Sequence, residues 1–197
     1  MSRFPKIDVD IDLRDEVVNL VEGSFDLAIR IGTLSDSDMM ARQLTDHRRI
    51  TCASPTYIEE HGAPETPSQL ARYQFLRFSL STDDRWVFVH TAGDHQRNEI
   101  QVNLKGRVRI NDTDAMLELA ILGHGVALLP SWACDHALRD GRLVELLPGW
   151  EARLQRAETA VWAVYPRKKT VSSKVRAFID FYANVVDLLA ELTHFYV

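Results

Sequence analysis

The sequence predicts an α/β protein built around a parallel sheet. Residues 106–130 read as a buried strand, a polar turn, an apolar helix, a pair of glycines and a second buried strand, with almost no connecting residues. That order is typical of a βαβ unit, because a crossover helix lets the second strand run parallel to the first. Apolar runs typical of strands recur at residues 25–31 and 159–165, and a helical stripe of apolar residues occupies the carboxyl-terminal segment.

The amino-terminal part is expected to contain strands and one short helix. Residues 7–13, IDVDIDL, alternate strictly between apolar residues and aspartates, which predicts a strand with one buried face and one wet face. A helix is expected over residues 15–22, where Gly23 ends it. A strand at residues 25–31 and an extended segment at residues 39–46 follow.

Prolines and turn residues divide the next part of the chain. Pro55 suits the first turn of a helix over residues 56–61, and the pair Thr66-Pro67 repeats that signal for a second short helix. The other segments are expected to be strands, the last two of them paired as a hairpin: residues 48–54, 73–78, 85–90 and 99–104.

The polar turn at residues 111–114 is the most informative stretch for function. It lies where the first strand of the predicted βαβ unit ends and its helix begins. In open parallel sheets ligands bind at that place, against backbone N–H groups that the helix leaves unpaired. The alternative is that these asparagine, aspartate and threonine residues only cap the helix, as such residues often do.

The carboxyl-terminal part is expected to return to helices and one strong strand. Residues 132–139 read as helical and residues 142–147 as extended. Residues 148–158 read as an irregular, polar linker, and a strand is expected at residues 159–165. The last helix begins near Ser173 and has one apolar stripe at helical spacing.

Composition limits the classes of protein to consider. The chain has 197 residues, enough for one large domain or two lobes. Its formal net charge of −5 argues against binding of a nucleic-acid phosphate backbone by this chain itself. The printed sequence has neither an apolar run of membrane-spanning length nor a secretion leader, so we expect a cytoplasmic protein with no membrane partner. Cys52 and Cys134 lack metal or redox spacing and are expected to be reduced packing residues.

The sequence nominates no catalytic residue, metal site or cofactor. The glycines around His124 begin a dinucleotide-binding pattern, but they precede a strand where the motif requires them to follow one. No histidine pair has helical metal spacing, and no nucleophile stands beside a candidate base. We therefore expect a non-enzymatic protein.

Several stretches together resemble the effector-binding region of LysR-type transcriptional regulators. They occur in the family's order and spacing over residues 4–183. The resemblance rests on these segments: FDLAIRIG at 25–32, RRITCASPTYIEEHG at 48–62, TPSQL at 66–70, NDTDAMLELAILGHGVALLPSW at 111–132 and GRLVELLPGW at 141–150.

The resemblance implies a two-lobed, periplasmic-binding-protein-like fold of type 2, whose lobes are joined by two crossover strands and bind an effector between them. Lobe I would comprise residues 1–53 and 149–197, and lobe II residues 54–148. The family's helix-turn-helix and the first strand of lobe I have no counterpart in these residues. The effector-binding positions that match by place are Gly32, Thr33, Ser79, Ser81, Asn111, Asp112, Thr113, Gly125, Val126 and Pro130.

The leading hypothesis is therefore a small-molecule sensing domain of a homodimeric transcription regulator. The hydroxyl and amide groups of the predicted site suit a carboxylate effector. Dimers would form through lobe I, with residues 7–13 and the last helix as candidate contacts. DNA would be bound only through a helix-turn-helix in the full-length protein. The alternatives are a solute-binding protein of a transporter, which requires export, and an enzyme on the same fold.

Overall fold

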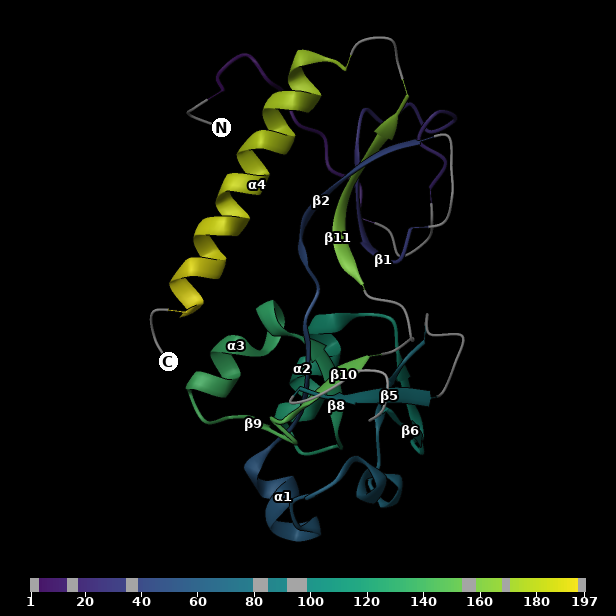
Figure 1. Cartoon of the computed structure of the whole chain (residues 1–197), viewed down its shortest axis with the longest axis vertical. Coiled ribbons are helices and arrows are strands. Elements are labelled where there is room, and N and C mark those ends of the chain that lie inside the picture. The colour runs from purple at the N-terminus through teal and green to yellow at the C-terminus, as the bar shows by residue number, and fades with distance from the viewer. Residues whose placement is uncertain are drawn as a thin grey trace. The chain divides into compact units, whose positions relative to one another are not determined.

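The computed structural model describes residues 4–13, 18–34, 39–79, 85–91, 99–153, 159–167 and 171–194 (Figure 1). The chain divides into two compact units. The first unit comprises Met1–His47 and Thr159–Val197, and the second comprises Arg48–Glu158.

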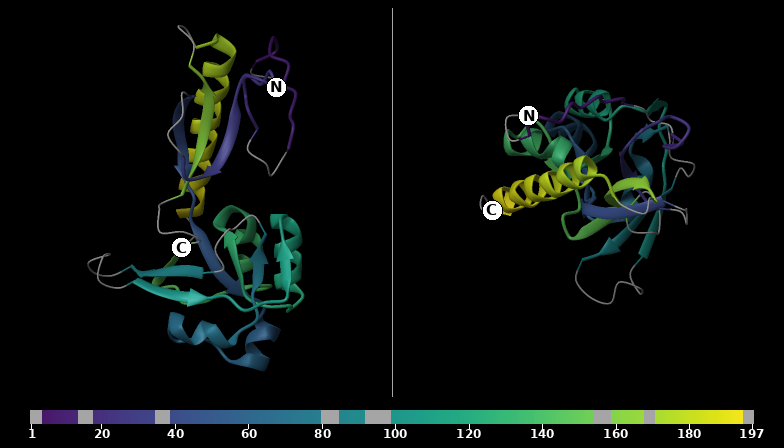
Figure 2. Two further views of the ribbon diagram at one scale, coloured as in Figure 1. Left: turned by 90° about the vertical axis from the view of Figure 1, so that its right-hand side faces the viewer. Right: turned by 90° about the horizontal axis from the view of Figure 1, so that it is seen from above.

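The first unit is a sheet covered by one long helix. Its strands are antiparallel in the order β1-β11-β2, and α4 lies along one face of the sheet (Figure 2). Leu44 and Ala163 of the sheet pack there against Val175 and Ile179 of the helix. The bounds of these elements are β1 Ala28–Gly32, β2 Met39–Asp46, β11 Ala160–Pro166 and α4 Ser173–His194.

The second unit contains the remaining elements. Its helices are α1 Pro55–His61, the 3-10 helix η1 Pro67–Arg72, α2 Thr113–Ile121 and α3 Ser131–Arg139. Its strands are β3 Arg49–Ala53, β4 Leu76–Phe78, β5 Arg85–His90, β6 Glu99–Asn103, β7 Val108–Ile110, β8 Ala127–Pro130, β9 Val144–Glu145 and β10 Trp150–Arg153.

The predicted βαβ unit is confirmed as β7, α2 and β8. Strand β4 lies between the two strands: it pairs in parallel with β7, and Phe75, just before β4, forms a parallel bridge with Val126, just before β8. Strand β3 pairs antiparallel with β8 on its other side and with β9. The carboxyl ends of β4, β7 and β8 therefore share one edge with the start of β3.

Two apolar clusters hold the second unit together. One of them joins α2 and α3 to β3 and β8 through Met116, Ala137, Cys52 and Leu129. The other contains a group of aromatic residues, in which Phe75, Trp86 and Phe88 are buried with their rings in edge or tilted contact. Both cysteines are buried and free, as expected.

Two sequence predictions about strands are wrong. Residues 7–13 form no strand, and Val9, Ile11 and Leu13 are 38%, 72% and 90% exposed. An alternating pattern produces a strand only where a neighbouring strand supplies hydrogen bonds, and none in the described chain pairs with this segment. Conversely, the expected irregular linker contains β10, because Trp150–Arg153 pairs with β5 at the side of the hairpin.

Most other elements agree with the prediction. The expected hairpin is confirmed as the antiparallel pair β5 and β6. The strand expected at residues 73–78 is shorter, since β4 begins only at Leu76. Of the helix expected at 15–22, residues 15–17 lie outside the described residues, and residues 18–22 are not helical, since residues 20–24 form a turn.

The boundaries of the two units differ from the predicted lobe boundaries. The structure groups residues 48–53 and 149–158 with the second unit, whereas the prediction assigned them to lobe I. The reason is strand pairing: β3 pairs with β8 and β9, and β10 pairs with β5, all within the second unit.

Within the described residues no helix is long and apolar enough to cross a membrane. The same part of the chain shows no cluster of three or more histidine, cysteine, aspartate or glutamate side chains arranged for a metal ion.

Candidate functional site

Ser79 and Asn111 come together at the carboxyl edge of the parallel strands. Phe78 is in register with Ile110, and the backbone N–H of Ser79 donates to the carbonyl of Ile110 at 2.8 Å. Asn111 directly follows Ile110 and is exposed. The pairing of β4 with β7 therefore places the two polar residues predicted from different parts of the sequence side by side.

Asp112 and Thr113 begin helix α2 at the same edge. Asp112 is the N-cap, and its Oδ1 accepts a hydrogen bond from the backbone N–H of Ala115 at 2.7 Å. Thr113 is the first helical residue and is half-buried. The capping role considered in the sequence analysis is thus the one that Asp112 has, and its negative charge lies where the helix dipole stabilises it.

Gly125 and Val126 lie at the opposite, amino-terminal end of β8. Val126 is buried, its N–H donates to the carbonyl of Gln74 at 2.8 Å, and its carbonyl accepts from Leu76 at 2.9 Å. Gly125 has a φ of +150°, and a Cβ at this position would lie 2.6 Å from the carbonyl oxygen of Gln74. Both residues hold β8 against the chain around β4.

Pro130 ends β8 at the same edge of the sheet as the carboxyl ends of β4 and β7. It is in register with Arg49, and its carbonyl accepts a hydrogen bond from the Sγ of Cys134 at 3.4 Å. Gly32 and Thr33 belong to the first unit, where the Gly32 carbonyl accepts from Trp162 Nε1 at 2.9 Å, and Ser81 is outside the described residues.

Arg49 is a residue of this edge that the sequence analysis did not identify. It is half-buried at the start of β3, and its Nη1 donates to the carbonyl of Leu128 at 3.4 Å. The guanidinium carbon lies 5.9 Å from the centroid of the Phe78 ring, a cation–π distance. Burial lowers the pKa of Arg49 to about 10, so the side chain is still charged at neutral pH but poorly hydrated.

One signal in the sequence points toward Arg49. It is the first residue of β3, a strand in which Ile50, Thr51 and Cys52 are all buried, so its side chain lies at the rim of the core. Its neighbour Phe78 is distant in sequence, however, and only the pairing of strands across the sheet brings the two together.

This edge has the chemistry of an anion site. A poorly hydrated guanidinium stands beside the end of β4, and the amino terminus of α2 begins at the end of the adjacent strand. Helix amino termini attract negative charge through unpaired N–H groups, and arginine binds carboxylates with two parallel hydrogen bonds. The hydroxyl groups of Ser79 and Thr113 add neutral donors at the same edge.

The fold and this edge define a class: an α/β ligand-binding protein with its polar residues at the carboxyl ends of parallel strands. The sequence profile of the family described as LysR substrate binding domain matches residues 1–187. The chain therefore belongs to the LysR substrate-binding domain family and has the two-lobed, periplasmic-binding-protein-like fold of its regulatory domains.

Relatives and solved structures agree with that membership. The chain is 36% identical over 181 residues to the HTH-type transcriptional regulator PtxR of Pseudomonas aeruginosa, an alignment that covers 91% of this chain and 55% of PtxR. CrgA of Neisseria meningitidis, a LysR-type transcriptional regulator, is 27% identical with a TM-score of 0.76, over 93% of this chain and 60% of CrgA. The Vibrio cholerae virulence activator AphB has the same fold, with 24% identity and a TM-score of 0.76 over 94% of this chain and 60% of AphB. The chain thus spans little more than half the length of these proteins.

Proposed function

We propose that this chain is the effector-binding part of a transcription regulator and that it holds a small carboxylate at the carboxyl edge of β4, β7 and β8. The observation that carries the proposal is the environment of the Arg49 side chain. A guanidinium that is half-buried against Phe78, with one long hydrogen bond to a backbone carbonyl, has donors to spare for a ligand.

The charges of the edge favour an anion of modest size. Arg49 supplies a full positive charge, and the first turn of α2 supplies the partial positive charge of a helix amino terminus. Two carboxylates oppose an anion here: Asp112, one of whose oxygens accepts the N–H of Ala115, and the exposed Asp114 in the first turn of α2. Arg49 would take the carboxylate, and Ser79, Asn111 and Thr113 would orient the rest of the molecule.

The remaining roles belong to the longer protein. The relatives are regulators of the helix-turn-helix type, so we assign DNA contact to such a segment outside this acidic chain and expect the protein to act in the cytoplasm. We also propose a homodimer through the first unit. With no strand formed at residues 7–13, helix α4 is the candidate contact, and light scattering that finds only monomer at high concentration would count against it.

The regulator is preferred to the two alternatives because the curated relatives carry regulatory names. A transporter component or an enzyme on this fold would instead be expected to have relatives with those activities. We accordingly propose that effector binding, with no catalysis, is the activity of this chain.

A thermal-shift screen of small aliphatic and aromatic carboxylates tests the proposal. A ligand that binds only the folded state raises the melting temperature, by an amount that grows with concentration above Kd. We expect at least one acid to stabilise the wild-type chain and to lose that effect in Arg49→Gln. Arg139→Gln is the matched control, since Arg139 is an exposed arginine of the same unit paired with Asp135 at 3.6 Å. Equal stabilisation of wild type and Arg49→Gln would refute the proposal.

A further inference from the structure

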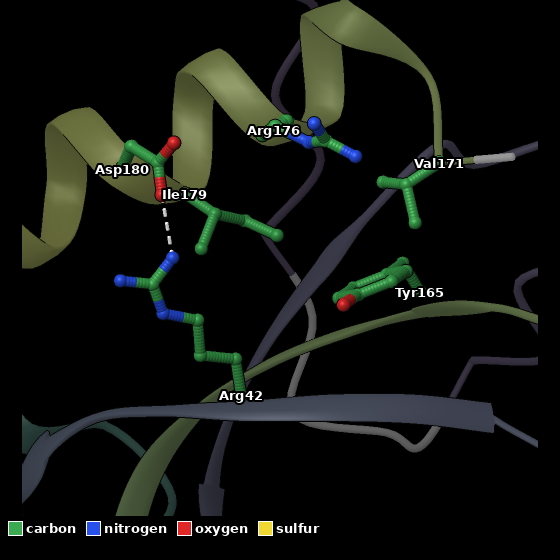
Figure 3. Close-up of a pocket in the computed structure, with 6 residues that line it drawn as sticks. All are labelled: Arg42, Tyr165, Val171, Arg176, Ile179 and Asp180. Carbon is green, nitrogen blue, oxygen red and sulfur yellow. Dashed lines mark hydrogen bonds and ion pairs between the residues drawn. The ribbon is translucent and has the colours of Figure 1, made fainter.

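A cavity of about 230 Å³ opens in the first unit between helix α4 and the sheet. It is smaller than the roughly 300–1,000 Å³ typical of sites for drug-sized ligands, which suits a small organic molecule. Six residues line it: Arg42, Tyr165, Val171, Arg176, Ile179 and Asp180 (Figure 3).

The cavity has an apolar wall and a charged mouth. Ile179 is buried, and Tyr165 and Val171 are half-buried. Together these three residues form a surface that can contact the aromatic or aliphatic part of a ligand. Arg42 of β2 forms an ion pair with Asp180 of α4, with 2.5 Å between Nη1 and Oδ1. Both side chains of that pair are about half exposed, at 48% and 52%, so water screens their attraction. Little free energy is therefore lost when Arg42 leaves Asp180 for another carboxylate.

Arg176 supplies the positive charge that the ion pair does not use. It lies one helical turn before Asp180, but Asp180 pairs across the cavity with Arg42. Figure 3 shows the Arg176 side chain extending toward Val171, away from Asp180. Among the residues the structure describes, no partner for the Arg176 guanidinium is found. Two arginines against one aspartate leave the mouth with one net positive charge.

We propose that this cavity is a second ligand site, separate from the edge around Arg49, and that it takes a small organic monoanion with an apolar body. The apolar part would lie against Tyr165, Val171 and Ile179. The carboxylate would bind Arg176 and compete with Asp180 for Arg42.

The test measures benzoate binding to the whole chain carrying Arg49→Gln. This substitution removes carboxylate binding at the edge around Arg49, so that any remaining binding belongs to the cavity. We expect benzoate to shift the amide resonances of Tyr165, Val171 and residues 176–180 in ¹⁵N-¹H spectra. Acetate, which lacks the ring, and benzyl alcohol, which lacks the charge, should each bind more weakly. Shifts that appear equally with all three compounds, or that avoid these residues, would overturn the proposal.

Three further substitutions, each combined with Arg49→Gln, distinguish specific binding in the cavity from non-specific electrostatic binding of anions. Arg176→Gln should weaken benzoate binding about tenfold, because a charge-assisted hydrogen bond is lost. Lys174→Gln, which removes the same charge from an exposed position on the same helix, should leave it unchanged. Asp180→Asn should tighten binding by up to about fivefold, because it frees Arg42. Equal weakening by Arg176→Gln and Lys174→Gln, or weaker binding in Asp180→Asn, would contradict the proposal.

The test separates this site from the proposed effector site. Loss of binding in Arg49→Gln alone concerns the carboxyl edge of the parallel strands, whereas loss in Arg176→Gln concerns the cavity under α4. Failure of one leaves the other standing.

Discussion

The guanidinium of Arg49 lies over the ring of Phe78, with 5.9 Å between its central carbon and the ring centroid. This contact joins the first residue of β3 to the last residue of β4, across β8. It places a positive charge at the edge where β7 ends and α2 begins.

Arg49→Met should raise stability and remove ligand binding. Burial disfavours the charged guanidinium, as its lowered pKa indicates, so an apolar side chain of similar length should stabilise the ligand-free chain by about 1 kcal/mol. Urea unfolding measures this change. A loss of more than about 2 kcal/mol would show instead that Arg49 holds the fold together.

Asp112→Ala should lower the free energy of unfolding by about 1 kcal/mol, because the N–H of Ala115 loses its capping acceptor. Asp112→Asn keeps a capping oxygen and should stay close to wild type in the same urea titration. Since Asp112→Asn also removes a negative charge from the start of α2, it should bind carboxylates more tightly. Weaker binding in Asp112→Asn would place the ligand elsewhere.

Gly125→Ala should destabilise the chain by at least about 2 kcal/mol. The residue has a φ of +150°, and the new Cβ would meet the backbone oxygen of Gln74 at 2.6 Å. Gly141→Ala provides the comparison, because Gly141 also has a positive φ, +71°, but open space around its Cβ. That variant should lose only about 1 kcal/mol. Equal losses of unfolding free energy in the two variants would mean that the close approach of Gly125 to Gln74 does not contribute to the cost of Gly125→Ala.

Stability should fall with pH above about 10 in a way that depends on Tyr57. Burial raises the pKa of Tyr57 above its ordinary value of 10.0, and its hydroxyl oxygen accepts the N–H of Gln74 at 3.0 Å. As pH rises past 10, the unfolded chain therefore releases this proton before the folded chain does, and the unfolding free energy decreases. Tyr57→Phe should be less stable than wild type by about 1 kcal/mol at neutral pH. That difference should shrink between pH 9 and pH 11, and a constant difference across the range would contradict the assignment.

The parts of this fold that could be predicted are those that local pattern specifies. The βαβ unit from β7 to β8 was predicted because its strands, helix and glycines follow one another directly, and the hairpin of β5 and β6 because two strand patterns flank a turn-rich loop. Segments whose state depends on a distant partner could not be predicted. In the described part of the chain, no strand pairs with the alternating residues 7–13, whereas β10 forms because β5 lies beside it.

The candidate site follows the same rule. Asn111, Asp112 and Thr113 were predicted because a polar turn between a strand and a helix is visible in the sequence, and Ser79 because it ends a strand. Gly125 and Val126 match the family by position, but their place at the other end of β8 depends on the bridge to Phe75. Arg49 was missed because its contact with Phe78 requires the register of β3 with β8 and of β8 with the chain around β4.

The most direct test of the central claim is a map of amide resonances on the ¹⁵N-labelled chain, titrated with the acid that stabilises it best in the thermal screen. The claim predicts that the largest shifts fall on Ser79, residues 111–115 and Arg49, and that they disappear in Arg49→Gln while Arg139→Gln retains them. Shifts that avoid this edge, or that survive unchanged in Arg49→Gln, would contradict it.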